Sequence, residues 1–131
     1  MPFDHERLDV YRLALDFLVL AERVIHSLPK GRAHLADQLT RASLSVVLNI
    51  AEGAGKFSRG DKRRYYLAAR GSATESAALL DVCGRLNLAA GVDLQAGKEM
   101  LERIVAMLVR LARSFEDPGI SGSATVTGSG S

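Results

Sequence analysis

The stretch SLSVVLNIAEGAGKFSRGDKRRYYLAARGSATES, residues 43–76, decides the fold of this chain of 131 residues. Both of its halves repeat apolar residues at helical spacing, and they meet in a short segment rich in glycine and basic residues. Gly53 and Gly55 stand where a left-handed C-cap, which favours glycine, would end the first helix. Ser58 and Asp61 have the spacing of a capping box that starts the next helix. The stretch therefore predicts two helices joined by a turn.

Helical periodicity extends over four segments of the chain. The expected bounds are residues 4–28, 32–54, 58–88 and 93–115, with Asp4 and Asp93 as N-caps of the first and last segments. The core face of the second segment is predicted to comprise Leu35, Leu39, Ala42, Val46 and Ile50. No segment alternates with a period of two for long enough to form a strand. The pattern predicts an all-α fold, an antiparallel up-down four-helix bundle with short joints.

Length and composition set the broad class of protein. With 47% hydrophobic residues, the chain can bury a core as one domain, which we place at residues 1–116. Residues 117–131 are small and polar without periodicity, and they predict a flexible Gly/Ser-rich tail. The single Cys83 fits a reducing cytosol, no apolar run approaches the roughly 20 residues that span a bilayer, and no export signal is recognisable. We expect a cytoplasmic protein with no membrane segment.

The first and fourth predicted helices are apolar over unusually wide arcs. Between Leu13 and Leu28, apolar residues cover roughly 200° of the helix circumference, whereas a helix with one solvent-exposed side needs an apolar arc of about 100°. The arc between Leu94 and Phe115 is similarly wide. Such arcs favour a homo-oligomer over the alternative, in which the bundle itself buries these helices more deeply.

The sequence fits no catalytic or metal-binding pattern. A di-iron bundle needs Glu-x-x-His pairs, and the nearest approach is a single pair of Glu22 with His26 at i and i+4. Lys56 follows Gly53 and Gly55 without the spacing of a phosphate-binding loop. Cys83 lies among apolar neighbours, where a cysteine usually serves packing. The sequence predicts no catalytic residues, no metal and no cofactor, and hence a protein that is not an enzyme.

Six polar residues form a stripe on the second and third predicted helices. They are Arg41, Ser45, Asn49 and Glu52 on the second, and Arg70 and Glu75 on the third. Gly71 lies beside them inside a helix, where it costs roughly 1 kcal/mol relative to Ala, so we expect it to let a neighbouring backbone approach. The favoured interpretation is a half-buried network that clamps two helices through the pairs Arg41–Glu75 and Arg70–Glu52. The alternative is a pocket for a ligand or nucleic acid.

The joint between the second and third helices is strongly basic. It carries Lys56, Arg59, Lys62, Arg63 and Arg64 against one acid, Asp61, hence a local charge of +4. Phe57, Tyr65 and Tyr66 lie within or beside it, and aromatic rings among cations can stack on bases while the cations contact phosphates. We regard this joint as the candidate nucleic-acid-binding surface. A solvated loop with its aromatics turned inward is the alternative.

The residues between 35 and 83 carry a specific resemblance. The pieces Asn49-Ile50-Ala51-Glu52-Gly53 and Ala69-Arg70-Gly71-Ser72, at this separation, resemble the four-helix family encoded in intervening sequences of bacterial 23S rRNA genes, which includes the accessory variability proteins of diversity-generating retroelements. The resemblance extends more loosely over about residues 4–115. It implies a four-helix protomer that assembles as a ring-like homopentamer, and it does not imply an enzyme. Its retroelement members imply a reverse transcriptase and nucleic acid as partners.

Two classes of function follow. The first is a nucleic-acid or ribonucleoprotein accessory module that binds RNA or DNA through the basic joint. The second is a structural or protein-interaction scaffold without a nucleic-acid role.

Overall fold

The computed structural model describes residues 4–116 of the chain, and the expected tail at 117–131 lies outside them. A 3-10 turn, η1 (Asp4–Arg7), precedes four α-helices: α1 (Asp9–Ser27), α2 (Ala33–Gly55), α3 (Arg59–Arg85) and α4 (Gly91–Ser114). No strand occurs among the described residues. The predicted all-α fold with four helices is confirmed.

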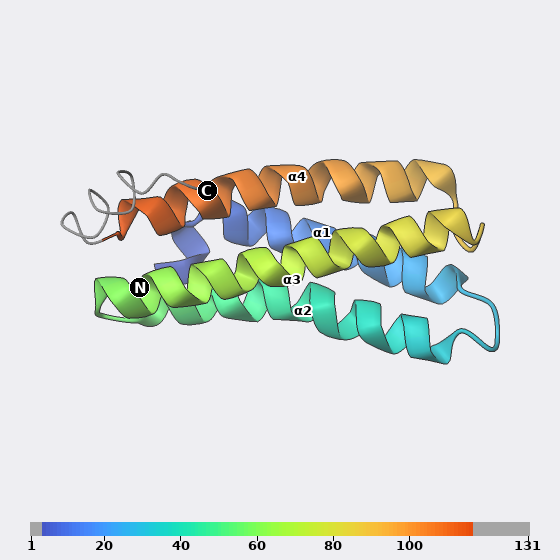
Figure 1. Ribbon diagram of the computed structural model, residues 1–131, viewed down its shortest axis with the longest axis horizontal. Coiled ribbons are helices and arrows are strands. Elements are labelled where there is room, and N and C mark those ends of the chain that lie inside the picture. Colours follow the sequence, from blue (N-terminus) through green and yellow to red (C-terminus); the bar gives the residue numbers. More distant parts are fainter. Residues whose placement is uncertain (1–3, 117–131) are drawn as a thin grey trace, which may run out of the picture.

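The helices lie side by side, and each packs against two others. The neighbours of α1 are α2 and α4, and the neighbours of α3 are also α2 and α4. Figure 1 shows the joint between α2 and α3 at the left end of the molecule, close to the end of α4. The α1–α2 and α3–α4 joints lie together at the right end. The basic joint therefore shares one end of the molecule with the last turn of α4.

All four helices contribute to one core. Its largest fully buried side chains include Phe17, Leu39, Ile50, Leu80, Leu101, Ile104 and Leu108. Burying a side chain of this size stabilises a fold by about 1.5–3 kcal/mol each relative to leaving it exposed. Leu39 and Ile50 belong to the predicted core face of α2, and both are completely buried.

Several helix ends differ from the predicted ones. The N-cap of α1 is Leu8 and that of α4 is Ala90, so neither Asp4 nor Asp93 is an N-cap. A carboxylate is favourable in the first turn of a helix as well as at the N-cap position, and Asp93 lies in the first turn of α4. Ser58 is an N-cap as predicted, because its Oγ accepts a hydrogen bond from the Asp61 backbone N–H at 3.1 Å.

The end of α3 uses a left-handed residue that the sequence did not indicate. Asn87 has φ of 56°, and the N–H groups of Asn87 and Leu88 donate to the carbonyls of Gly84 and Cys83, at 3.1 and 2.9 Å. This is the Schellman arrangement, in which two orphan carbonyls of the last turn find donors. It ends α3 at Arg85, three residues before the expected end.

Gly53 and Gly55 do not form left-handed caps. Both lie inside α2, and Gly31 is the glycine with positive φ among the described residues, at 92°. Gly31 belongs to the α1–α2 turn, in which the Arg32 N–H donates to the Pro29 carbonyl at 3.2 Å. Gly53 has a different role, because a Cβ there would lie 2.9 Å from Cε1 of Tyr66. It is required for close packing of α2 on α3.

Candidate nucleic-acid interface

Two of the five joint cations donate hydrogen bonds to backbone carbonyls at helix C-termini. Lys62 Nζ donates to the backbone carbonyls of Gly53 and Ala54 at 3.3 and 2.9 Å, in the last turn of α2. Arg59 Nη2 donates to the carbonyls of Ser114 and Glu116, at 2.8 and 3.3 Å, at the end of α4. The last carbonyls of a helix have no partner within the helix and carry partial negative charge, so a cation satisfies both needs. Lys62 and Arg59 are therefore held by the fold.

The other three joint cations form exposed or half-exposed ion pairs. Lys56 Nζ lies 3.6 Å from Glu52 Oε2, Arg63 Nη2 lies 3.7 Å from Glu116 Oε2, and Arg64 Nη2 donates to Asp61 Oδ1 at 3.1 Å. Once these three carboxylates are counted against the five cations, the joint has a net charge of +2, half of the value that the segment alone suggested. Exposed pairs contribute about 0–1 kcal/mol each, so a competing anion can displace them.

The three aromatic residues of the joint have three different environments. Phe57 lies in the turn with a relative exposure of 101%, so its ring contacts solvent on all sides. Tyr65 is half-buried, with Lys56 Nζ and Arg64 Cζ each 5.1 Å from its ring centroid. Tyr66 is buried, and its ring centroid lies 6.0 Å from that of Phe115. Phe57 is thus the one aromatic ring of these three with both faces available to a base.

The six-residue polar stripe does not form one network. Asn49 Nδ2 donates to the Ser45 hydroxyl and carbonyl, both at 2.9 Å, and the hydroxyl of Ser72 on α3 donates to Ser45 Oγ at 2.8 Å. This half-buried cluster links α2 to α3. Sequence reasoning did not include Ser72 in the network, although its place one residue after Gly71 put it near the stripe.

The charged members of the stripe lie outside that cluster. Arg41, Glu52, Arg70 and Glu75 are all exposed, and within residues 4–116 neither Arg41–Glu75 nor Arg70–Glu52 forms an ion pair. The predicted clamp through these two pairs is therefore wrong. Spacing along two helices placed these residues on neighbouring faces, but their long side chains extend into solvent.

Gly71 does not permit a close helix approach. It is exposed, and a Cβ added there would meet nothing within 4 Å. Gly53 and Gly97 are the helical glycines at crowded positions, since a Cβ on Gly97 would lie 2.8 Å from Leu80 Cδ1. The close-packing role predicted for Gly71 belongs to these two residues.

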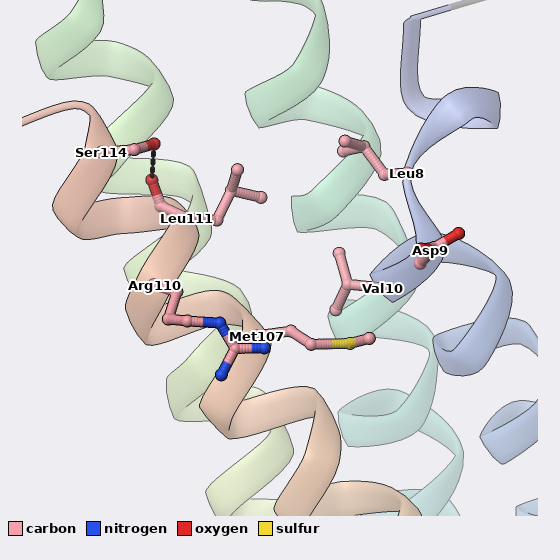
Figure 2. A pocket seen from close by; sticks show the side chains of 7 residues that line it. All are labelled: Leu8, Asp9, Val10, Met107, Arg110, Leu111 and Ser114. Atoms are coloured by element: carbon pink, nitrogen blue, oxygen red, sulfur yellow. Dashed lines mark hydrogen bonds between the residues drawn. The ribbon is translucent and has the colours of Figure 1, made fainter.

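A mostly apolar hollow of about 330 Å³ lies between the start of α1 and the last turns of α4. Figure 2 shows Leu8, Val10 and Leu111 around it, with the Met107 side chain extending across the space between the two helices. The dashed line in that view joins the Ser114 hydroxyl to its own helix, at the Leu111 carbonyl. The polar groups here do not converge on the space, and the hollow offers no arrangement for chemistry.

Two buried ionisable groups have shifted pKa values. Burial raises the pKa of the Cys83 thiol, which keeps it protonated and unreactive. Burial, with a smaller contribution from the Asp4 carboxylate, raises the pKa of Tyr66. Both groups belong to the core. In the part of the chain that the structure describes, no group of three His, Cys, Asp or Glu side chains could hold a metal ion, and no helix is long and apolar enough to cross a membrane.

Comparison with known proteins places this arrangement in a family. Residues 6–110 match the family described as 23S rRNA-intervening sequence protein. A crystal structure of a protein of unknown function, from the S23 ribosomal protein family of Bacteroides thetaiotaomicron VPI-5482, superposes with a TM-score of 0.73 at 20% sequence identity. The alignment covers 79% of this chain and 95% of that one. No curated protein matches the chain. The superposition shows that the two proteins share a fold, and the match over residues 6–110, most of the sequence, shows that the chain belongs to the 23S rRNA-intervening sequence protein family.

Proposed function

We propose that this protein is a non-enzymatic, oligomeric accessory module of the cytoplasm that binds single-stranded nucleic acid through the α2–α3 joint, without sequence specificity. The carrying observation is the fully exposed ring of Phe57, which immediately follows Lys56 in the turn before α3, while Arg64 lies in the first part of α3. A base can stack on this ring while the two cations contact the flanking phosphates. Stacking of one base on an aromatic side chain contributes about 1–3 kcal/mol.

Lys56 and Arg64 are the joint cations best suited to phosphate contacts. Each forms an ion pair with one surface carboxylate, whereas Arg59 and Lys62 are bonded to helix carbonyls. Lys56 Nζ and Arg64 Cζ each lie 5.1 Å from the Tyr65 ring centroid, which keeps the two charges near one another. A phosphate would replace the carboxylate of Glu52 or Asp61 at little cost.

Oligomerisation would place several copies of this weakly binding joint in one assembly. The proposed assembly is a ring of antiparallel up-down four-helix protomers, and its support is a set of exposed apolar residues on the outer faces of α1 and α2: Leu15, Val19, Leu44 and Leu48. The sequence indicated α1 and α4 for this role; of the eight large apolar side chains that are exposed among the described residues, four lie on α1 and α2, and Val92 lies on α4. Several copies of one charged joint on a common side would raise the effective affinity for a long strand.

The proposed binding is tested by anisotropy of labelled single-stranded RNA and DNA at low and moderate salt. The variant Lys56→Gln/Phe57→Ala/Arg64→Gln leaves the helix-capping Arg59 and Lys62 in place. We expect it to bind at least tenfold more weakly, since about 1.4 kcal/mol of lost stacking alone is a factor of ten. The matched control, Lys30→Gln/Arg32→Gln, removes two exposed charges at the opposite end of the molecule (Figure 1) and should bind as the wild type does.

Wild-type protein that fails to bind either strand at low salt would refute the nucleic-acid role. The exposed apolar face of α1 and α2 would then favour the second candidate, a scaffold that binds protein partners. Light scattering of the same samples reports the oligomeric state, and a stable monomer at micromolar concentration would refute the oligomer.

A further inference from the structure

A cavity of about 240 Å³ opens between α3 and α4 and is lined by three arginines. Arg63 and Arg70 come from α3 and Arg113 from α4, with one carboxylate, Glu116, among them. The remaining lining side chains are apolar. The lining therefore has a net charge of +2. Its volume is several times the ~30 Å³ share of one water molecule in the liquid, which leaves room for a small anion with waters.

The arginines of this cavity have few partners within residues 4–116. Glu116 lies 3.7 Å from Arg63, too far for a hydrogen bond, and Arg63 Nε is buried with no hydrogen-bond partner among the described residues. Within the same part of the chain, Arg70 and Arg113 have no carboxylate at ion-pair distance. A buried N–H of a charged group is costly to leave without a partner, so an external acceptor is favoured here.

The cavity is continuous with the basic joint through Arg63, which belongs to both. The nearby end of α4 would repel an anion, but Arg59 already donates to the Ser114 and Glu116 carbonyls there. Planar guanidinium groups bind phosphate oxygens in pairs of parallel hydrogen bonds, with better geometry than a lysine offers.

We propose that the α3–α4 cavity is a phosphate-binding site in which Arg63, Arg70 and Arg113 hold one phosphate group. The inference rests on the proposed function for one source of that group, the backbone of a strand that also contacts the joint. Free phosphate or a phosphate monoester is the other source. The site was not apparent from the sequence, because Arg70 and Arg113 lie 43 positions apart and meet only when α3 packs on α4.

The test uses the full chain and the variant Arg70→Gln/Arg113→Gln, which changes two exposed residues and leaves Arg63 with Glu116. Its control, Arg41→Gln/Arg103→Gln, removes the same charge at exposed positions that do not line the cavity. One arm measures binding of oligothymidylate across a salt series. The other measures the melting temperature in inorganic phosphate and in chloride at equal ionic strength.

If a strand supplies the phosphate, the plot of log K against log salt becomes shallower by about 0.7, because the cavity holds one phosphate of the strand, and the control keeps the wild-type slope. If free phosphate is the ligand, it raises the melting temperature of the wild type and of the control but not of the cavity variant. Either result supports the site and identifies the source.

A cavity variant that equals the wild type in both arms would overturn the proposed site. Should the joint variant then still lose strand binding, the proposed function would stand without it. Conversely, if the joint variant keeps wild-type affinity and the cavity variant no longer responds to phosphate, the cavity site stands and the joint is not the nucleic-acid-binding surface.

Discussion

Two glycines of this protein should respond to alanine in opposite directions. Glycine inside a helix is less favourable than Ala by about 1 kcal/mol, so both Gly53→Ala and Gly71→Ala gain that amount from the backbone. At Gly71 the new methyl group would meet nothing within 4 Å. We therefore expect Gly71→Ala to stabilise the protein by about 1 kcal/mol.

At Gly53 the methyl group would meet rigid neighbours. Its Cβ would lie 2.9 and 3.0 Å from two ring carbons of Tyr66 and 3.1 Å from Cβ of Tyr65. The Tyr66 ring is buried against Phe115, and a Cβ atom moves only with its backbone, so neither neighbour can give way cheaply. Overpacking of this kind costs about 1–3 kcal/mol. After the helix gain is subtracted, Gly53→Ala should be destabilising by about 0–2 kcal/mol, which places it about 1–3 kcal/mol below Gly71→Ala.

Equilibrium urea unfolding followed by circular dichroism measures this difference. Protomer concentration must be the same for all samples, because the stability of an oligomer depends on it. Unchanged m-values would show that the shifts in midpoint reflect stability alone. If Gly53→Ala proves as stable as Gly71→Ala, the close contact of α2 with Tyr66 does not limit the packing, and the reasoning fails.

Three further predictions concern the core and the joint. The folded state raises the pKa of Tyr66 above the ordinary 10.0, so it binds the phenol proton more tightly than the unfolded state does. The stability from this group is intact below about pH 10 and falls as pH rises through the folded pKa, so the urea midpoint of Tyr66→Phe should fall less over that range than that of the wild type. Cys83 is completely buried with a raised pKa, so its labelling by a disulfide reagent at pH 8 should be slow in buffer and fast in urea; equal rates would show that α3 is not packed as described. Lys62→Ala removes the donor to two α2 carbonyls and should lower the free energy of unfolding by about 1 kcal/mol, whereas Arg64→Ala loses a surface pair and should lower it by less than about 0.5 kcal/mol. Equal melting temperatures for the two variants would contradict the capping role of Lys62.

The four helices were predictable because apolar spacing is a local property of the chain. Ser58 was identified as an N-cap for the same reason, since its partner lies three residues away. The starts of α1 and α4 were misplaced because an aspartate can serve the first turn of a helix from more than one position. Gly53 was misassigned because glycine serves two purposes: it tolerates a left-handed backbone, and it leaves room for a neighbour. The helical backbone of Gly53 and the Tyr66 ring beside it distinguish the two.

The joint was recognisable from its composition, but the roles of its cations were not. The carbonyls that Arg59 binds lie 55 and 57 residues further along the chain, and no local pattern connects them. The pairs Arg41–Glu75 and Arg70–Glu52 were inferred from helix faces alone. Face assignment gives the direction of a Cβ atom, but a long exposed side chain is free to remain in solvent.

Because the joint cations have different partners in the fold, the salt dependence of nucleic-acid binding indicates which of them contact phosphates. If all five joint cations met phosphates of a single strand, the slope of log K against log salt would be about −3.5 per copy. Arg59 and Lys62 would have to abandon helix carbonyls to do so, which would leave those carbonyls without donors. Binding by Lys56 and Arg64 alone gives a slope of about −1.4, and adding the one phosphate held in the α3–α4 cavity gives about −2.1. The slope therefore reports which cations are available for binding, and a value near −3.5 would mean that the strand competes with the helix caps for the same side chains.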